Sequence, residues 1–458
     1  MLAAPRGVTP GRPTESGAKV VPFDPEEIAA SIDEKLQARN IALSPGGEVA
    51  FRRDQLIALA PSADDPPDSL VPGERDNDET PIVFSNDSAA FRYHFVDNPL
   101  QTSVDINSTN PGLTSVNQVF FGEPVYLGNP VYLGNPVYLG NPVYLGNPVY
   151  LGNPFLRNSA RPAAEPAGWP NKTPGGPARE SRVLILDTGL ATNSGQPANA
   201  ELHGHAEIHP NWTDATNLPG NRDLSRTDED ELGLDGGNLD RQAGHGTFIA
   251  GIIRSIAPDA EIWTQGVLSS FGDGDDYDVS AGMTEAIERS RQLGVRIDIV
   301  NLSLGGHTID DLPYPVLAKA VTDAQAQGAV VVAAAGNAGS CRVFWPACLP
   351  GVISVGATFC GERAWFSNFG PWVKASAPGV DVVSTFYTHD GPAVSVAGYD
   401  PDEYLGWAEW SGTSFAAPQV AAAIAKRMGA TGEDPEVAAS EVVNGGNPVP
   451  DLGRLVVV

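Results

Sequence analysis

Apolar runs and helical patterns alternate in the C-terminal part of the chain. Stretches with apolar residues at helical spacing cover 279–293 and 314–327. Continuous runs of Val, Ile, Leu and Ala lie before, between and after these two stretches. Such runs are typical of strands buried on both faces of a parallel sheet. These strands are expected at 183–186, 297–304, 329–335 and 352–357. The pattern predicts an α/β domain over 178–458, with a mostly parallel sheet and helices on both of its faces.

The first 123 residues have a weaker pattern. Asp24 as N-cap and Pro25 at the first helical position begin one predicted helix, with apolar positions at spacing four as far as Leu36. Residues 48–59 are predicted to be a strand, and the acidic, proline-containing segment 61–80 is typical of a disordered connector. We therefore expect a small α+β or partly disordered N-terminal region with a thin core.

A tandem repeat separates these two parts. Residues 124–153 contain Pro-Val-Tyr-Leu-Gly-Asn five times. Proline at every sixth position excludes a helix, and Gly-Asn-Pro favours a turn. An extended linker is the favoured interpretation; short stacked β structure and a specific ligand surface are the alternatives. Together with 154–177, the repeat forms a predicted linker over 124–177.

Charge and hydropathy exclude some functions. The chain has 28 basic and 56 acidic residues, a net charge of −28. Bulk charge will therefore not attract nucleic acid or an anionic membrane. No apolar run approaches the roughly 18 residues of a membrane span, and the N-terminus has no apolar segment of signal-peptide length. We expect a cytoplasmic or non-classically exported protein, unless the true start lies upstream.

The three cysteines leave two interpretations open. Cys341 and Cys348 are seven positions apart and could close one small loop, which would leave Cys360 unpaired. The alternative is three buried thiols, because no secretion signal is present. The closely spaced His203, His205 and His209 could suggest a metal site, but a solvated loop is the favoured interpretation.

Four polar residues in the C-terminal domain stand where chemistry is often found. Asp187 ends an apolar strand, at the edge of the sheet where open α/β folds build their sites. His245 lies between two glycines at the start of an apolar helix, and Ser414 lies at the start of another, where the helix N-terminus favours negative charge. Asn337 follows a strand and Gly336, and its amide can donate a hydrogen bond without carrying charge.

The order Asp187, His245, Asn337, Ser414 resembles the subtilisin-type serine endopeptidases, or subtilases, in which the triad runs Asp, His, Ser along the chain. The local motifs match over 178–458: Asp-Thr-Gly, Gly-His-Gly-Thr-x-x-Ala-Gly, Ala-Ala-Gly-Asn and Gly-Thr-Ser-x-Ala-Ala-Pro-x-Val-Ala. The resemblance implies a triad of Asp187, His245 and Ser414 that acts through an acyl-enzyme intermediate, with Asn337 as oxyanion donor. No cofactor or metal is required for this chemistry. Structural calcium is frequent in the family, but ligands for it are not readable in this sequence.

The resemblance also implies a peptide-binding cleft. A primary specificity pocket would have Phe344 at its floor, which predicts a shallow pocket favouring Ala, Val or similar side chains. The alternative is that Phe344 points into the core. An edge strand would contain Gly272 and Gly274. The implied pocket walls are Ser303, Leu304, Gly305, Ala334, Ala335 and Gly336.

The edge segment is unusually acidic, with Asp273, Asp275, Asp276 and Asp278. A solvated acidic loop is the favoured interpretation. Preference for basic substrates and a calcium site are the alternatives, although the spacing lacks the glycine and distal glutamate of an EF-hand.

The role of residues 1–123 has two interpretations. Residues 44–123 could form an inhibitory propeptide, as in a zymogen, with self-cleavage expected between about 152 and 181 because such linkers are preferred proteolytic sites. Residues 1–123 could instead be a permanent accessory domain. The expected partner is a protein or peptide substrate, with no nucleic acid and no membrane span. A catalytically idle subtilase fold that binds peptides and a repeat-bearing scaffold are the alternative functions.

Overall fold

The structure is a computed structural model. It describes residues 40–43, 50–60, 74–75, 82–83, 90–109, 114–122, 160–193, 196–197, 199–208, 239, 242–270, 272–308, 311–389 and 404–457. The predicted helix at 24–36, the hexapeptide repeat and most of the predicted connector 61–80 lie outside these residues. In the described ranges, no helix is long and apolar enough to cross a membrane.

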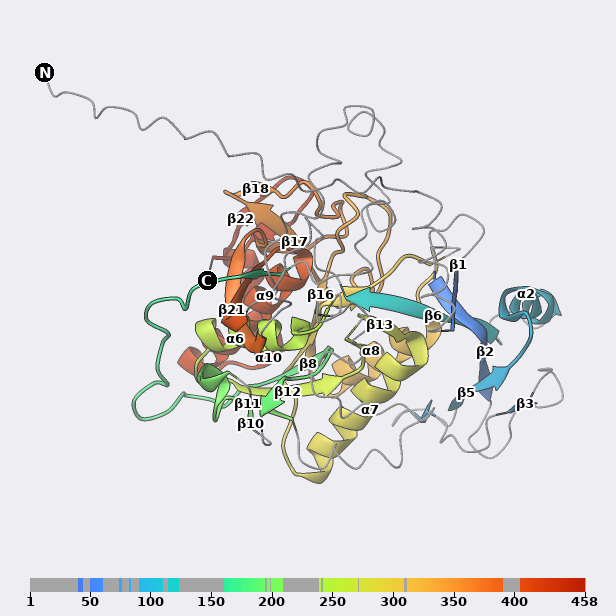
Figure 1. Ribbon diagram of the computed structural model, residues 1–458, viewed down its shortest axis with the longest axis horizontal. Helices are drawn as coiled ribbons and strands as arrows, with labels where there is room; N and C mark the ends of the chain where they lie inside the picture. The colour runs from blue at the N-terminus through green and yellow to red at the C-terminus, as the bar shows by residue number, and fades with distance from the viewer. Residues whose placement is uncertain are drawn as a thin grey trace, which may run out of the picture.

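A mostly parallel sheet forms the centre of the C-terminal half, as predicted (Figure 1). Two of its pairs are antiparallel, β22 (Asn447–Pro448) with β23 (Arg454–Leu455) and the short β18 (Glu362–Arg363) with β17 (Ile353–Phe359). In order of hydrogen-bonded neighbours, its main path contains β11 (Ala206–Ile208), β12 (Glu261–Gly266), β8 (Arg182–Asp187), β14 (Ile299–Leu302), β16 (Val330–Ala334), β17 (Ile353–Phe359), β19 (Ala375–Pro378), β23 (Arg454–Leu455) and β22 (Asn447–Pro448).

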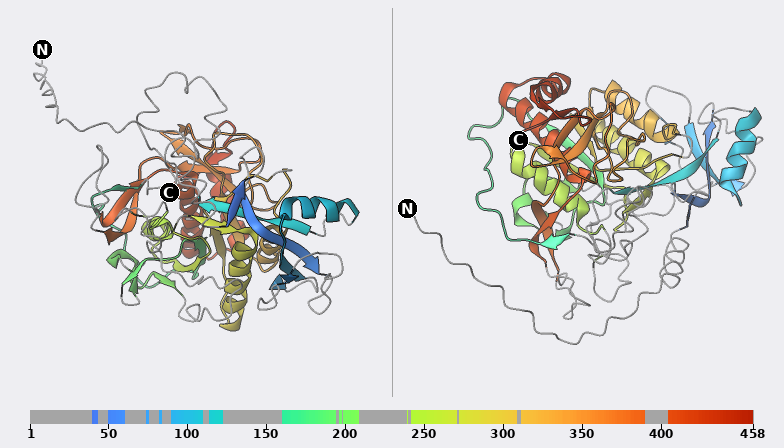
Figure 2. Two further views of the ribbon diagram at one scale, coloured as in Figure 1. Left: turned by 45° about the vertical axis from the view of Figure 1, so that its right-hand side comes forward. Right: turned by 90° about the horizontal axis from the view of Figure 1, so that it is seen from above.

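Helices cover both faces of this sheet (Figure 2). Along β8, Val183 and Ile185 pack into the core with α6 and α9, whereas Leu184 and Leu186 pack with α7 and α8 on the other face. Because successive strand residues point to opposite faces, a strand buried on both sides has no polar alternation. The helices are α6 (His245–Ile256), α7 (Asp276–Gln292), α8 (Pro315–Ala326), α9 (Thr413–Thr431) and α10 (Pro435–Gly445).

Smaller elements surround the central sheet. Trp169, in the predicted linker, packs edge-on against Trp407 with ring centroids 5.2 Å apart, so this stretch contacts the C-terminal half. A three-stranded sheet has the order β20, β21, β7, and β9 pairs with β10. These elements are β7 (Arg161–Pro162), β9 (Thr192–Asn193), β10 (Gln196–Pro197), the 3₁₀ helix η2 (Ala200–Leu202), β20 (Val382–His389) and β21 (Tyr404–Trp410).

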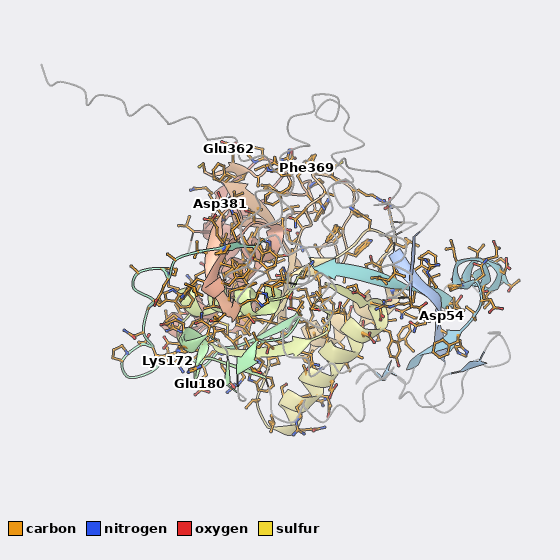
Figure 3. All side chains as sticks on the ribbon, viewed as in Figure 1. Asp54, Lys172, Glu180, Glu362, Phe369 and Asp381 are labelled. Carbon is orange, nitrogen blue, oxygen red and sulfur yellow. The ribbon has the colours of Figure 1, made fainter. Side chains whose placement is uncertain are left out.

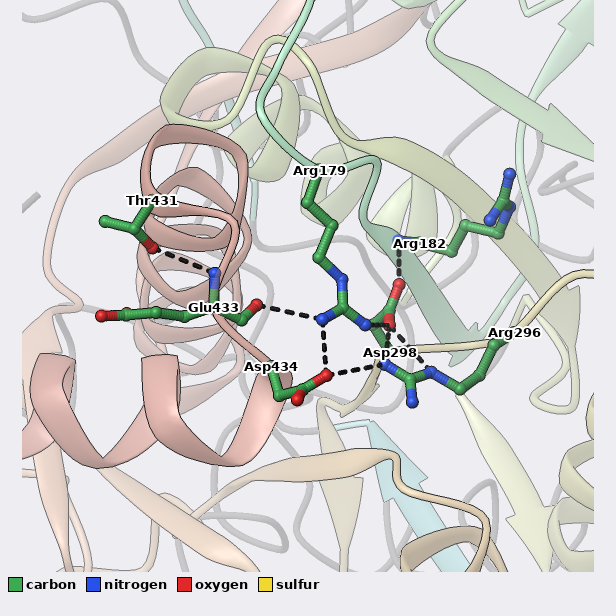
Figure 4. A network of polar contacts seen from close by, with 7 residues as sticks. All are labelled: Arg179, Arg182, Arg296, Asp298, Thr431, Glu433 and Asp434. Atoms are coloured by element: carbon green, nitrogen blue, oxygen red, sulfur yellow. Dashed lines mark hydrogen bonds and ion pairs between the residues drawn. The ribbon is translucent and has the colours of Figure 1, made fainter.

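A network of ion pairs and hydrogen bonds connects the first residues of the C-terminal half with the residues just before α10 (Figure 4). The buried Asp298 carboxylate accepts hydrogen bonds from Arg296 and Arg179, and from the backbone N–H of Arg182 at 3.0 Å. Arg179 also donates to Asp434, the residue before α10, at 2.6 Å. The network fixes the start of β8, the strand whose far end carries Asp187.

The N-terminal elements form a second sheet that continues into the C-terminal half. Its own core is small, with Leu56, Ala58 and Val96 buried together. The predicted strand at 48–59 is confirmed by β2, and β3 lies within the predicted connector. The elements are β1 (Ile41–Leu43), β2 (Ala50–Ala60), β3 (Glu74–Arg75), β4 (Ile82–Val83), β5 (Ala90–Phe95), α2 (Pro99–Thr109) and β6 (Thr114–Gly122).

β6 joins the two halves of the molecule. It pairs with β2 on the N-terminal side and with β13 (Asp273–Asp275) and β15 (Leu304–Gly305) on the other. In Figure 1 it runs from the N-terminal elements toward the carboxyl ends of the central strands. One chain segment from the N-terminal region therefore contributes a strand inside the C-terminal half.

Candidate active site

Asp187 and His245 form the first contact of the site. Asp187 is the last residue of β8, and its Oδ1 accepts a hydrogen bond from the backbone N–H of Thr188 at 2.8 Å. His245 Nδ1 lies 2.6 Å from the same Oδ1, and both side chains are fully buried. The carboxylate therefore holds the imidazole through Nδ1, which leaves Nε2 for chemistry.

Two glycines allow His245 to occupy this place. Gly244 has a φ of 85°, and a Cβ there would lie 2.1 Å from the Phe386 ring. A Cβ on Gly246 would lie 2.2 Å from the carbonyl oxygen of Gly189, in the turn after Asp187. Because any larger residue would clash, Gly244 lets the start of α6 lie against the Phe386 ring, and Gly246 lets it lie against the turn after β8.

Ser414 is the second residue of α9 and is fully buried. Its Oγ donates to the carbonyl oxygen of Ser303 at 3.2 Å, and Ser303 Oγ donates to the Ser414 carbonyl at 2.8 Å. His245 Nε2 is buried and makes no hydrogen bond within the described part of the chain. The serine hydroxyl therefore has to turn away from Ser303 before it can bond to the imidazole.

The imidazole lies among aromatic rings. The centroids of Trp410 and Phe415 lie 5.5 and 5.4 Å from that of His245. Both residues flank Ser414 along the chain, because Trp410 ends β21 and Phe415 follows the serine in α9. These rings exclude water from one side of the imidazole and strengthen its electrostatic contact with Asp187.

Asn337 is oriented by Thr413, the residue before Ser414. The Asn337 Oδ1 accepts from both the backbone N–H and the Oγ1 of Thr413, each at 2.9 Å. Thr413 Oγ1 in turn accepts from the Gly336 backbone N–H at 3.1 Å. Since its oxygen is held in this way, the Asn337 amide presents its Nδ2 as the donor group.

The predicted pocket walls lie on either side of Phe344. A Cβ on Gly305 would lie 2.4 Å from the Phe344 ring, and one on Gly336 would lie 2.9 Å from it. Phe344 is 3% exposed and also belongs to the core beneath α7 and α8. The ring thus fills the space between the two walls. The remaining predicted wall residues, Ser303, Leu304, Ala334 and Ala335, are fully buried.

The segment predicted to be the peptide-binding edge forms the strand β13, and β6 is paired with it. Gly274 is in register with Phe120 in an antiparallel pair, and Gly305 of β15 is in register with Phe121. The end of β6 therefore lies between β13 and the pocket wall. Gly272, just before β13, has a φ of 88° and packs on the Gln242 side chain.

The expectation of a solvated acidic loop is wrong. Asp273, Asp275, Asp276 and Asp278 are all at most 3% exposed. Asp273 and Asp275 form ion pairs with Arg52 of β2 at 3.3 and 2.8 Å. Asp276 instead accepts from the backbone N–H groups of Leu317 and Val316 at the start of α8. Arg52 was not predicted as a site residue.

Other sequence-based candidates lie apart from this site. His203 is exposed and His205 half-buried, and burial lowers the pKa of His205 to about 4, helped by the charges of Arg254 and Lys172. His209 lies outside the described residues, among which no group of three or more His, Cys, Asp or Glu side chains is placed to hold a metal. Cys341, Cys348 and Cys360 are all free thiols, but Cys341 and Cys360 are exposed and Cys348 is half-buried, so the expectation of three buried thiols is wrong.

The α/β fold contains a buried carboxylate–imidazole pair, and Phe415, the residue after the helix-start Ser414, packs against the same imidazole, an arrangement typical of sites with an activated nucleophile. A family model described as "Subtilase family" matches residues 179–441, more than half of the chain, so the chain belongs to the subtilase family. The chain is 30% identical to Subtilisin Savinase of Lederbergia lenta over 254 residues, covering 53% of this chain and 74% of that protein.

Other relatives are matched over shorter shares of their length. A Thermophilic serine proteinase of Bacillus sp. (strain AK1) is 37% identical over 188 residues, 39% of this chain and 40% of that protein. An Alkaline protease of Alkalihalobacillus alcalophilus is 30% identical, covering 53% of each. The chain thus spans about half the length of these two. The solved structure of a cold adapted subtilisin-like serine proteinase is similar with 24% identity and a TM-score of 0.46, over 66% of this chain and 96% of that one.

Proposed function

We propose that the chain is a serine endopeptidase that hydrolyses peptide bonds through an acyl-enzyme. The observation that carries this proposal is the 2.6 Å contact between His245 Nδ1 and Asp187 Oδ1, with Phe415, the residue after the helix-start Ser414, packed against the imidazole. With Nδ1–H donated to Asp187, Nε2 is the basic nitrogen. A serine hydroxyl is too weak a nucleophile by itself and needs such a base.

The reaction follows from these positions. Ser414 Oγ turns from Ser303 toward His245, attacks the substrate carbonyl carbon and gives its proton to Nε2. The carbonyl oxygen becomes an oxyanion, which accepts hydrogen bonds from Asn337 Nδ2 and the Ser414 backbone N–H. His245 then protonates the leaving amine as the C–N bond breaks. Water attacks the acyl-enzyme by the same route, with His245 again as base.

We further propose that the N-terminal region inhibits the site within the same chain and is removed by self-cleavage. The support is the position of β6, which pairs with β13 on one side and β15 on the other, where an extended substrate would add. While β6 holds both edges, a peptide cannot use the same backbone groups. We also propose a shallow pocket, because the Phe344 ring occupies the space between its walls.

The endopeptidase proposal is tested with a serine-directed fluorophosphonate and a fluorogenic peptide pool. Wild type and Ser411→Ala, a matched serine only three positions away, should be labelled once and should hydrolyse peptides. Ser414→Ala should do neither. Hydrolysis or labelling that survives in Ser414→Ala would overturn the mechanism. Peptide binding by wild type without hydrolysis or labelling would favour the idle, peptide-binding subtilase instead.

A further inference from the structure

A buried ion pair connects the N-terminal region with the edge of the proposed cleft. Arg52, on β2, is 1% exposed although it is one of the longest charged side chains. Its Nε donates to Asp275 Oδ2 at 2.8 Å, and its Nη1 donates to Asp273 Oδ2 at 3.3 Å. Both acceptors lie on β13, on either side of Gly274. One guanidinium is therefore shared by two carboxylates at this edge.

The C-terminal half itself orients both carboxylates for such a cation. Asp273 Oδ1 accepts from Ser269 Oγ at 2.7 Å, and Asp275 Oδ1 accepts from the backbone N–H of Asp278 at 3.0 Å, as the N-cap of α7. In each case the second oxygen faces the guanidinium. The fork of an Arg side chain suits two such oxygens, and charge-assisted bonds of this kind are the stronger ones. The binding geometry thus resides in β13, and Arg52 is the group that the N-terminal region brings to it.

The register of β6 shows which substrate positions would meet this pair. Asp275 is opposite Val119, and Asp273 is opposite Phe121. Directly opposed residues of an antiparallel pair have side chains on the same face, with Cβ atoms about 4.5–5.5 Å apart. A substrate strand in the place of β6 therefore presents the side chains of two alternate positions, those of 119 and 121, on the face of the carboxylates. A Lys or Arg side chain is long enough to span that separation.

We infer that Asp273 and Asp275 are specificity-determining residues that select a basic side chain at one of these two substrate positions, and that Arg52 occupies their site in the full chain. This inference rests on the proposed endopeptidase function. Once the N-terminal region leaves, β13 loses both Arg52 and the paired strand β6. A substrate strand that pairs with β13 covers the two carboxylates again, and a buried charge without a partner is costly. A substrate Arg or Lys restores the pairing, whereas a neutral side chain of the same shape does not.

The test starts from the full-length chain, incubated until it has cleaved itself, and uses peptides that differ at one residue. Arg, citrulline (the uncharged analogue of Arg), Ala and Glu are placed in turn at each of the five residues before the cut bond. Efficiency is expressed per fluorophosphonate-titrated Ser414. Arg should exceed citrulline by about tenfold or more at one of two alternate positions. Asp273→Asn and Asp275→Asn should each reduce this ratio severalfold, since Asn keeps the Oδ1 acceptor. Glu362→Gln, which removes an exposed charge far from the N-terminal elements, should leave it unchanged (Figure 3).

A binding measurement supplies a second readout. In wild type that has cleaved itself and is then blocked at Ser414 with the fluorophosphonate, fluorescence anisotropy should give tighter binding of the Arg peptide than of the citrulline peptide. Equal rates and equal binding for the two peptides would overturn the inference while leaving the endopeptidase function intact. A preference that depends on added calcium, or that survives both Asn variants, would also overturn it. Failure of every peptide to bind or react would count against both proposals.

Discussion

In the proposed mechanism, Asp187 and Ser414 act on the same imidazole through different nitrogens, so their loss should have unequal effects. Ser414→Ala and His245→Ala remove the nucleophile and the base, and each should lower kcat by about 10⁶, the loss measured in subtilisin itself. Asp187→Asn keeps an oxygen near Nδ1 but removes the charge, and a loss of about 10⁴ is expected. Steady-state kcat and KM on one peptide decide this. Equal losses in Asp187→Asn and Ser414→Ala would contradict the orienting role of Asp187, and Asp381→Asn serves as a surface-carboxylate control.

The Phe344 ring lies against both Gly305 and Gly336, so it should limit the size of the substrate side chain that the proposed pocket accepts. Wild type should prefer Ala or Val over Phe on the acyl side of the cut bond. Phe344→Gly should move the preference toward Phe and Tyr, and Phe344→Leu, which keeps more of the volume, should lie between them. Removing a buried ring can cost about 3–5 kcal/mol, so Tm is measured alongside. An unchanged ranking in a folded Phe344→Gly variant would show that Phe344 acts only in the core.

The sequence was sufficient to predict the residues proposed for catalysis, but not the long-range contacts around them. Asp187, His245, Asn337 and Ser414 stand in short motifs whose turns and helix starts are local features. Arg52 is 223 positions from Asp275 and has no local motif, so its ion pair depends on a long-range contact. The solvated-loop expectation failed for the same reason. The bond between Ser414 Oγ and Ser303 depends on a rotamer, which a motif does not specify.

At the scale of elements, apolar runs were sufficient to predict the central strands, because strands buried on both faces need continuous hydrophobic residues. The predicted strands at 183–186, 329–335 and 352–357 correspond to β8, β16 and β17. Pairing was less predictable. The strand β13, Asp273–Asp275, is polar and short, and it exists because β6 pairs with it. The 3.6-residue pattern also could not show that α8 is capped from another helix.

Asp276 caps the start of α8 and is buried, so the stability of the chain should depend on pH. Burial raises the pKa of Asp276 from 3.8 to about 7, and the backbone N–H groups of Leu317 and Val316 offset this only in part. Between roughly pH 4 and 7 the folded chain holds a proton on Asp276 that the unfolded chain has released. The contribution to stability therefore decreases as pH rises through this window and stays low above it.

The variant Asp276→Asn should flatten this dependence, because the amide keeps an oxygen for the Leu317 N–H and never ionises. In the Ser414→Ala background, which avoids self-digestion, Tm is measured from pH 5 to 8. The variant should lose less Tm than the parent over this range and be the more stable at pH 8. Asp323→Asn, on α8 itself, is the charge-removal control. If the Tm of the variant falls with rising pH as steeply as that of the parent, Asp276 does not titrate in this range.

At the scale of the whole molecule, the two halves share one sheet through β6. The buried ion pair between Arg52 and Asp275 also connects them. Such a pair is weak support for stability, since desolvation offsets the Coulomb gain, but removing one partner leaves the other charges uncompensated. The N-terminal half is therefore held both by strand pairing and by a charge that only it supplies. If the chain is cut after β6, the N-terminal region can dissociate completely. In the uncut chain it can only open locally, because it stays covalently attached.

The last prediction concerns that cut. On incubation, wild type and Ser411→Ala should convert the 48.0 kDa chain to two fragments, whereas Ser414→Ala should stay intact. Intact mass measurements locate the cut. An end just after Gly122 would follow from β6 lying in the cleft, and an end between 152 and 181 would follow from the exposure typical of such linkers. Activity should rise as the N-terminal fragment is lost. An active preparation that remains full-length over hours would instead establish residues 1–123 as a permanent domain, and equal cleavage of Ser414→Ala would assign the cut to another protease.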